Sequence, residues 1–480
     1  MKNSVLITLL ITLNCIPISN IKAQTFGVGN AVSITGYGSY HPQIEISNDN
    51  SPIILWTDNS TKNVYFAKHN GTDFNTPIQI NPSGFDAQSY NWSGADLYTS
   101  QDNVYITFRS SGYETGHIYV VKSEDNGLTF GDTVRVDNLT EGFGQYPDLA
   151  VYNDTVFVTF MDHDAGGQTP QYVVSRSVDG GATFETEVVA GAFVGDEACD
   201  CCQPEIVVND KYVIVFFRNN ASNIRDIKGV ISYDRGVTFT DWISVDDHQW
   251  SIMACPSTGP DARLTNNQTT LTVYKTEESG EPKLFLNEYS IPSDASLSLT
   301  KISSSSVPNV NYPQLASSGD NIGIVWEGFS NSTDIFFNAS TSGTSGLDTN
   351  NIINITDKIG AQSKPDIIYY NNSYYVIYAD LSSLKFVEIS EALAINEIQK
   401  NEPLEVFPNP VKNLLNLKLP ITGAKNIQIV IIDMNGKVVY SKIHPNNELT
   451  QIDVSTLPAG VYSVEAKGGN TTTKSIITKL

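Results

Sequence analysis

The sequence is short of basic residues. It has 29 lysines and arginines against 52 aspartates and glutamates, a formal net charge of −23 over 480 residues. The acidic residues are spread along the chain rather than collected in one block. Nucleic acids and anionic membranes need basic surfaces, so neither is an expected partner. Solvation outside a cell accounts for the charge, and loosely bound calcium at turns rich in Asp and Asn is the lesser alternative.

The chain also lacks sustained helical periodicity and long apolar runs beyond its first 23 residues. The 23 Tyr, 20 Phe and 34 Gly are typical of an all-β protein. At the start, Lys2 precedes an apolar stretch over residues 5–13, and Ala23 is a small residue suited to cleavage before Gln24. This pattern predicts a signal peptide over residues 1–23 and no transmembrane segment in the mature chain.

An octapeptide Ser-x-Asp-x-Gly-x-Thr-Phe occurs three times. The copies are Ser123–Phe130, Ser177–Phe184 and Ser232–Phe239, at offsets of 54 and 55 residues. A fixed period of this size indicates one structural unit copied along the chain. The aspartate can accept hydrogen bonds from its own turn and the glycine supplies a positive φ, while Thr and Phe are expected to begin the next strand. Structural roles are therefore predicted for Asp125, Asp179 and Asp234.

A second periodic signal gives the number of units. A proline opens an alternating apolar run at Pro42, Pro147, Pro204, Pro260, Pro313 and Pro365. The gaps are 105, 57, 56, 53 and 52 residues, and Ala95 to Tyr98 fills the double gap, which makes seven copies. Each copy continues with short apolar runs between turn residues, as the four strands of a propeller blade would. The last copy has room for three strands, so residues 25–35 are expected to supply the outer strand and close the ring.

The octapeptides resemble the Asp box, or BNR repeat, of sialidase-like β-propellers. All three copies match at the serine, aspartate, glycine, threonine and aromatic positions. The resemblance implies a propeller over residues 24–395, seven-bladed by the count of copies, with a six-bladed ring of the true sialidase kind as the alternative. In that family the Asp boxes lie on the face away from the active site.

The C-terminal segment over residues 404–480 carries different motifs. They are, in order, Glu405–Pro410, Leu414–Leu417, Ile427–Asp433, Asn435–Lys437, Leu457–Tyr462 and Lys474–Leu480. They resemble the type A sorting domain of the type IX secretion system. The resemblance implies a small seven-stranded β-sandwich without chemistry of its own, after a linker over residues 396–403. It also implies export across the outer membrane of a Bacteroidota cell, with the secretion machinery as a partner, followed by release or surface attachment.

Functional residues are expected on the propeller face opposite the octapeptides, where second strands end and first strands begin. The second strands end near Asp58, Arg109, Asp162 with His163, Arg218, Lys275, Glu327 and Asp380. The residues before the first strands are His41, Asn91 with Trp92, Tyr146, a cysteine cluster, Tyr312 and Lys364. Arginine binds carboxylates through two nitrogens and aromatic rings stack on sugars, so this rim suits an extracellular glycan as ligand. The alternative is that residues at strand ends are polar only because they are exposed to solvent.

Three classes of function follow, and the sequence leaves open whether the protein is an enzyme. The first is a glycan-degrading enzyme with Tyr312 and Glu327 as nucleophile and partner and with Asp162 and His163 as further catalytic candidates. A true sialidase is disfavoured, because the first copy has His41 before its proline and no arginine. The second class is a non-catalytic surface binding or adhesion protein.

A polysaccharide lyase is a variant of the enzymatic class. It needs an acid and a base beside an arginine that neutralises a uronate carboxylate. His163, Tyr146, Arg109 and Arg218 are the residues that could meet this need. The third class is a metal-dependent enzyme that uses the cysteines.

Cysteine is scarce and unevenly placed. After the signal peptide only Cys199, Cys201, Cys202 and Cys255 remain. In an oxidising exterior two disulfides are expected, one of them joining blades. A thiolate metal site is the alternative, with His163 or His248 as an extra ligand. Four cysteines allow three pairings, which the sequence does not decide.

Overall fold

The computed structural model describes residues 26–34, 40–112, 114–163, 170–191, 197–356, 360–381, 383–391, 404–418, 426–434, 436–445, 449–468 and 471–480. The predicted signal peptide and the predicted linker over residues 396–403 lie outside the described residues. All regular secondary structure in the described residues is β-strand. No described segment forms a helix long and apolar enough to span a membrane. The chain divides into two compact units, of which the first ends at Glu391.

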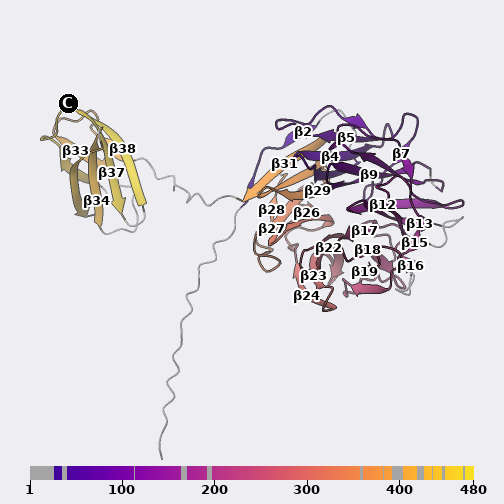
Figure 1. Ribbon diagram of the computed structural model, residues 1–480. Helices are drawn as coiled ribbons and strands as arrows, with labels where there is room; N and C mark the ends of the chain where they lie inside the picture. Colours follow the sequence, from indigo (N-terminus) through magenta and orange to yellow (C-terminus); the bar gives the residue numbers. More distant parts are fainter. Residues whose placement is uncertain are drawn as a thin grey trace, which may run out of the picture. The chain divides into compact units, whose positions relative to one another are not determined.

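The first unit consists of seven antiparallel sheets (Figure 1). The first holds β3 (Tyr40–Ile46), β4 (Pro52–Asp58), β5 (Asn63–Lys68) and β6 (Ile78–Gln79), and the second β7 (Ala87–Gln88), β8 (Asp96–Ser100), β9 (Asn103–Ser110), β10 (Ile118–Ser123) and β11 (Val134–Arg135). The third holds β12 (Phe143–Tyr152), β13 (Thr155–His163), β14 (Gln171–Ser177) and β15 (Val188–Val189), and the fourth β16 (Glu197–Ala198), β17 (Glu205–Val208), β18 (Val213–Asn220), β19 (Ile227–Ser232) and β20 (Asp241–Ser244). The fifth holds β21 (Asp261–Leu264), β22 (Thr269–Glu278), β23 (Glu281–Ser290) and β24 (Ala295–Lys301), and the sixth β25 (Asn311–Ser318), β26 (Asn321–Phe329), β27 (Thr333–Ser340) and β28 (Ile353–Asn354). The seventh holds β29 (Gln362–Tyr370), β30 (Ser373–Asp380), β31 (Ser383–Glu391), β1 (Phe26–Val28) and β2 (Val32–Ile34).

The sheets form a closed ring. The strands β3, β8, β12, β17, β21, β25 and β29 each contact the next, and β29 contacts β3 again. The ring closes through the N-terminus as predicted, because β1 and β2 pair with β31 at Phe26↔Glu391 and Val32↔Phe386. The unit is therefore an all-β propeller. Its seven described sheets match the seven copies in the sequence, and the six-bladed alternative has no counterpart in them.

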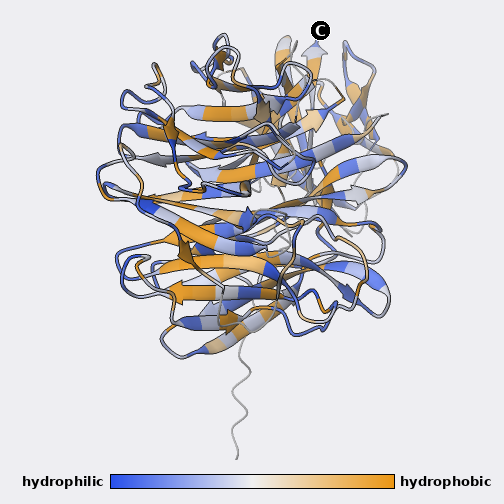
Figure 2. Cartoon of the chain, turned by 90° about the vertical axis from the view of Figure 1, so that its right-hand side faces the viewer, coloured by the Kyte–Doolittle hydropathy of each residue, from blue (hydrophilic) through white to orange (hydrophobic). Residues whose placement is uncertain are grey.

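The core lies between neighbouring blades. Ile53, Leu55 and Phe66 of the first sheet share one buried cluster with Ile106 and Phe108 of the second. Figure 2 shows apolar residues concentrated in the strands and polar residues in the connecting loops. Because a single blade cannot bury both its apolar faces alone, the ring has to form as a whole.

The three octapeptides fold into the same turn. Asp125 Oδ1 accepts hydrogen bonds from Ser123 Oγ at 2.7 Å and from the Thr129 amide at 2.8 Å, and Oδ2 accepts one from Thr129 Oγ1 at 2.6 Å. The same contacts recur around Asp179 and Asp234. The predicted structural role of the aspartates matches this geometry. Hydrogen bonds, first of all that from the threonine hydroxyl, lower the pKa of Asp125 and of Asp179 to about 2.

One detail of the octapeptide prediction is wrong. Thr129 and Phe130 do not begin the next strand, since β11 begins only at Val134. The hydrogen bonds to Asp125 hold the threonine in the turn, and Phe130 packs on Phe66 of the preceding blade with ring centroids 5.0 Å apart. Gly127 has a φ of 83°, and a Cβ there would lie 2.5 Å from the Phe66 ring. Both the conformation and the contact require glycine.

The described residues of the second unit form a small sandwich of two sheets with seven strands, the number predicted. One sheet holds β32 (Glu405–Phe407), β33 (Leu414–Lys418) and β36 (Leu449–Asp453). The other holds β34 (Asn426–Asp433), β35 (Val438–Pro445), β37 (Gly460–Gly468) and β38 (Thr471–Lys479). Leu415, Ile429, Val464 and Ile477 are fully buried in its core.

Candidate binding site at the channel mouth

The first strands of the blades enclose a central channel of about 400 Å³. Its wall carries one acid or amide from each blade, at the position after the proline or its equivalent. These residues are Gln43, Asp96, Asp148, Glu205, Asp261, Gln314 and Asp366. Glu45 adds a further carboxyl, and Arg263 is the one arginine among the described lining residues. Arg263 Nη1 lies 2.5 Å from Asp261 Oδ1 and 3.3 Å from Glu205 Oε1.

Three of the channel carboxyls each tie their blade to the next one. The amide of Ile206 donates to Asp148 Oδ2 at 2.6 Å, the amide of Leu315 to Asp261 Oδ2 at 2.5 Å, and the amide of Ile44 to Asp366 Oδ2 at 2.7 Å. Burial raises the pKa of Asp148 to about 8 and the pKa of Asp366 well above its usual range. The sequence analysis missed this ring, although the recurring acid or amide after the proline was the signal that could have found it.

Four blades have a β-bulge at the mouth of the channel, where the first strand begins. The register shifts between Tyr40 and Gln43 and at the equivalent places in β12, β25 and β29. Each bulge holds the residue before the proline at positive φ: His41 at 48°, Tyr146 at 53°, Tyr312 at 46° and Lys364 at 54°. Positive φ is strained for residues other than glycine, and bulges that re-aim a side chain are common beside binding sites.

His41, Trp92, Tyr312 and Lys364 line one pocket at this mouth, together with Gln203 and Thr258. The structure therefore brings together most of the residues that the sequence analysis placed before the first strands. Glu327 and Lys275 lie next to them. Glu327 Oε1 accepts the Lys364 amide at 2.7 Å, and Lys275 Nζ lies 3.3 Å from Asn311 Oδ1, beside Tyr312.

Burial sets the charges at the mouth. It lowers the pKa of His41 to about 4, with the charge of Lys364 as the next cause, so the imidazole is neutral at pH 7. It raises the pKa of Tyr312 to about 12 and the pKa of Glu327 to about 7. It lowers the pKa of Lys275 to about 8 and also lowers the pKa of Lys364. At neutral pH the mouth therefore has two ammonium groups, two neutral proton-transfer groups and a half-ionised carboxyl.

One side of the mouth is aromatic. Trp92 stacks on Tyr90 with ring centroids 5.4 Å apart and an interplanar angle of 20°. Tyr90 meets Tyr146 edge to face at 5.5 Å. Tyr146 is buried, so Trp92 is the ring of this group that faces the mouth pocket. An indole held in place by two further rings is a rigid surface for the apolar face of a sugar.

Contrary to the prediction, Arg109 and Arg218 do not present their guanidinium groups to a ligand at this mouth. Both are fully buried. Arg109 donates to the carbonyls of Gly144 and Gly112 at 2.6 and 2.7 Å and also to Gln88 Oε1. Arg218 donates to the carbonyls of Thr258, Arg225 and Lys275 at 3.0, 2.5 and 2.8 Å. Each guanidinium is buried and donates to carbonyls of other segments, so it ties those segments together.

The four catalytic candidates do not form one site. Asp162 lines a different groove, between Asn138 and Glu187 on the third blade. His163 is buried and its ring stacks parallel on Phe143 at 4.5 Å. Tyr312 and Glu327, in contrast, lie together at the mouth, since Asn311 next to Tyr312 pairs with Glu327 in the sheet.

The two remaining ligand candidates have local partners. Asp58 caps its own turn, because its Oδ1 accepts the Ser60 amide at 2.8 Å. Asp380 accepts Gln362 Nε2 at 3.1 Å and lies 3.6 Å from Lys385 Nζ. Neither lines the mouth pocket in the part of the chain that the structure describes.

One of the two predicted disulfides is present. Cys201 and Cys255 form a disulfide that joins the segments before the first strands of the fourth and fifth blades. Cys199 and Cys202 are unbonded, so the second disulfide is not present. Among the described residues, the group of possible metal ligands here comprises only Cys199, Cys201 and Cys202. His163 and His248 do not belong to it, and His248 Nδ1 lies 2.7 Å from Asp246 Oδ1.

Residues 405–479 match the family model of the secretion system C-terminal sorting domain. The second unit is therefore a sorting domain, and the protein is secreted or attached to the outer-membrane surface, as the sequence predicted.

Among solved structures, the chain is similar to three proteins at low identity. A polysaccharide lyase of family PL25, an ulvan lyase, aligns over 74% of this chain and 95% of its own at 11% identity and a TM-score of 0.48. A puromycin hydrolase aligns over 80% of this chain and 58% of its own, at 8% identity and a TM-score of 0.50. A subtype N10 neuraminidase-like protein from a little yellow-shouldered bat isolate aligns over 63% of this chain and 96% of its own, at 10% identity and a TM-score of 0.42. Identities this low bear on the fold alone. No curated protein matches the chain.

Proposed function

We propose that the protein is an exported surface propeller that binds an acidic extracellular glycan at the channel mouth. The observation that carries the proposal is the placing of Lys364, Lys275 and Trp92 around one mouth. A lysine ammonium attracts a uronate carboxylate or a sulfate, and the indole offers the flat apolar face on which a sugar ring can stack.

The charge of the mouth supports an anionic ligand in particular. The chain as a whole carries −23, so an acidic polysaccharide is repelled by most of its surface. Lys364 lines the mouth pocket and its ammonium lies 4.0 Å from the centroid of the Tyr40 ring. A partly buried ammonium gains more from an anion than an exposed one, because water screens the pair less. Locally positive charge on an acidic protein favours binding at this place over others.

The mouth does not support hydrolysis by a pair of carboxylates. Glycosidases of that kind hold two carboxyl groups on either side of the scissile bond, roughly 5 to 9.5 Å apart. The described residues that line the mouth pocket include no Asp or Glu, and Glu327 beside it accepts a backbone amide. The pocket itself is small, with a cavity of about 20 Å³. Binding is therefore the function that the geometry supports best.

The test compares an acidic polysaccharide with a neutral one of similar linkage by titration calorimetry. The protein should bind the acidic polymer, and Lys364→Gln should weaken this binding about tenfold, or about 1.4 kcal/mol. Lys211→Gln is the matched control, because Lys211 is exposed in the turn between β17 and β18, at the opposite end of its blade. Equal affinity for both polymers, or equal loss in both variants, would contradict the proposal.

A second candidate function is β-elimination of a uronate polymer. The specific observation in its favour is that Tyr312 and the neutral His41 line the same pocket as Lys364. A lyase needs a base for the proton next to a carboxylate that a cation neutralises. If this function is present, the ultraviolet absorbance of the unsaturated product should rise, and Tyr312→Phe should abolish the rise while binding persists. Binding without any such product would leave the first function standing alone.

A further inference from the structure

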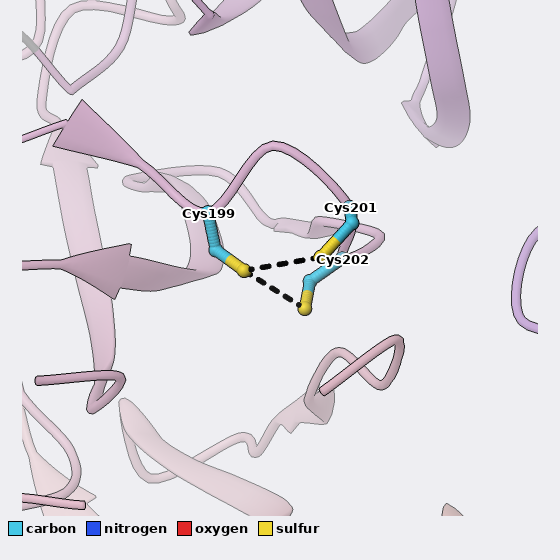
Figure 3. Close-up of side chains that lie close together, drawn as sticks. All are labelled: Cys199, Cys201 and Cys202. Carbon is cyan, nitrogen blue, oxygen red and sulfur yellow. Dashed lines mark hydrogen bonds between the residues drawn. The ribbon is translucent and has the colours of Figure 1, made fainter. Parts of the chain in front are cut away.

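Three cysteine sulfurs lie within 4.8 Å of one another beside the mouth (Figure 3). Cys199 is the central one. Its Sγ lies 3.2 Å from Cys202 Sγ and 3.6 Å from Cys201 Sγ, and Figure 3 shows it facing both. Cys201 is at the same time bonded to Cys255. Within a segment of four residues, a buried dithiol thus lies next to one sulfur of a disulfide.

The surroundings make Cys199 the nucleophile of the pair. A hydrogen bond from Cys202 lowers the pKa of Cys199 to about 7, and the charges of Arg225 and Arg218 act in the same direction. Burial raises the pKa of Cys202 well above its usual range. Arg225 is itself buried, and its Nε and Nη1 have no hydrogen-bond partner among the described residues. A guanidinium with unused donors beside a thiol stabilises the thiolate, which is the reactive form.

We propose that Cys199 and Cys202 form a thiol–disulfide exchange site whose substrate is the Cys201–Cys255 disulfide. In the first step the Cys199 thiolate attacks Cys201 Sγ. A Cys199–Cys201 bond forms, the Cys201–Cys255 bond breaks, and Cys255 leaves as a thiolate that takes up the proton lost by Cys199. In the second step the Cys202 thiolate attacks Cys199 Sγ, and Cys201 leaves and takes up the proton lost by Cys202.

The exchange needs no oxidant, because one disulfide and two thiols are present before and after it. The two states differ in which segments are linked. Cys201–Cys255 ties the fourth blade to the fifth, whereas Cys199–Cys202 lies within one segment. The hydroxyl of Tyr172 donates to the carbonyls of Cys199 and Cys202 at 3.2 and 2.9 Å, which keeps that segment in place in either state.

The exchange would affect the mouth of the channel. Gln203 follows Cys202 directly, Thr258 and Gly259 follow Cys255 closely, and all three line the mouth pocket. The two segments are in tight contact, since a Cβ on Gly259 would lie 2.2 Å from the Gln203 carbonyl oxygen. Exchange would release the covalent tie between them. This inference does not depend on what the mouth binds.

Two other uses of the sulfurs fit less well. A three-sulfur metal site requires the Cys201 thiolate, but that sulfur is held in the disulfide. Reaction with an outside disulfide requires access, but Cys199 and Cys202 are both fully buried. The neighbouring disulfide sulfur is the partner that Cys199 can reach.

The test maps disulfides in the full exported chain without reductant. The protein is incubated at neutral pH, quenched with acid, denatured, alkylated and digested for mass spectrometry. We expect two alkylated cysteines per chain, and both linked peptides, Cys201–Cys255 and Cys199–Cys202, in proportions that a change of temperature shifts reversibly. Cys199→Ser should contain only Cys201–Cys255. Cys202→Ser should yield Cys199–Cys201 with a free Cys255 and should not proceed to a free Cys201.

Three results would overturn the proposal. The wild-type chain could contain only Cys201–Cys255 and two thiols that never exchange. It could contain no free thiol, which would mean two fixed disulfides. It could also contain a stoichiometric metal on the sulfurs, which metal analysis of the same sample detects. Because the wild-type measurement decides between these outcomes by itself, a variant that fails to fold does not prevent a decision.

Discussion

At the scale of single residues, burial rather than sequence neighbours decides the chemistry of the mouth. Glu327 and Lys275 belong to different blades, yet burial brings both of their pKa values close to neutrality, to about 7 and about 8. His41 and Tyr312 stay neutral for the same reason. The proposed glycan site should therefore respond to pH in a range where ordinary carboxylates and lysines do not titrate.

Binding of the acidic glycan should weaken as the pH rises from about 6 to about 9. Glu327 loses its proton through pH 7 and adds negative charge, and Lys275 loses its proton through pH 8 and removes positive charge. Both changes disfavour an anion. Titration calorimetry across this range checks the prediction, with the Glu327→Gln variant as a comparison that should lose the step near pH 7. An affinity that does not change between pH 6 and pH 9 would show that neither group faces the ligand.

At the scale of elements, the sequence could predict what is local and repeated. The octapeptide turn depends on contacts within one segment, so the pattern around Asp125 already contains the hydrogen-bond partners that the structure shows. The strand that closes the ring followed from the missing strand of the last copy. The destinations of Arg109 and Arg218 depend on carbonyls of other segments, and the stacking of His163 on Phe143 depends on how β12 meets β13. No local sequence pattern shows which distant groups these side chains contact. For this reason the prediction of ligand residues at these strand ends is wrong.

The closing strand should be a sensitive point of the propeller. The Phe26 ring meets Phe337 and Tyr374 edge to face at 5.5 and 6.0 Å, between the last two blades. Phe26→Ala should lower the free energy of unfolding by about 2 kcal/mol, below the range for a fully buried Phe because Phe26 is only partly buried. Chemical denaturation measures this change. Val28→Ala on the same strand, exposed at 38%, should change it by less than about 0.5 kcal/mol, and equal effects would contradict the closure account.

At the scale of the whole molecule, the ring is held by polar side chains of the channel as well as by apolar cores. Every blade contributes an acid or an amide to the channel, and Asp148 keeps its proton up to about pH 8. In an unfolded chain an aspartate ionises near pH 4. Its contribution to stability is therefore complete below about pH 4 and is lost as the pH rises through about 8.

Asp148→Asn should make the stability of the propeller less dependent on pH. The amide oxygen can still accept the Ile206 amide, while the titrating proton is gone. Between pH 5 and pH 8 the wild-type chain should lose on the order of 2 kcal/mol more stability than the variant. Denaturant unfolding at a series of pH values checks this, and parallel pH profiles would show that the carboxyl is ionised in the folded protein.

The two compact units should be separable. Because residues 405–479 match a sorting domain and form their own core, deletion of residues 404–480 should leave the propeller folded but retained in the periplasm. Cell fractionation and the melting temperature of the truncated chain test the two parts of this expectation. Normal delivery of the truncated chain to the cell surface would contradict the export route.

The most direct measurement for the central claim is a crystal structure of the protein with an oligosaccharide of uronic acid. The account predicts a sugar ring stacked on Trp92, with its carboxylate within hydrogen-bond distance of Lys364 Nζ. A ligand bound instead in the groove beside Asp162, or on the octapeptide face with the mouth empty, would contradict it.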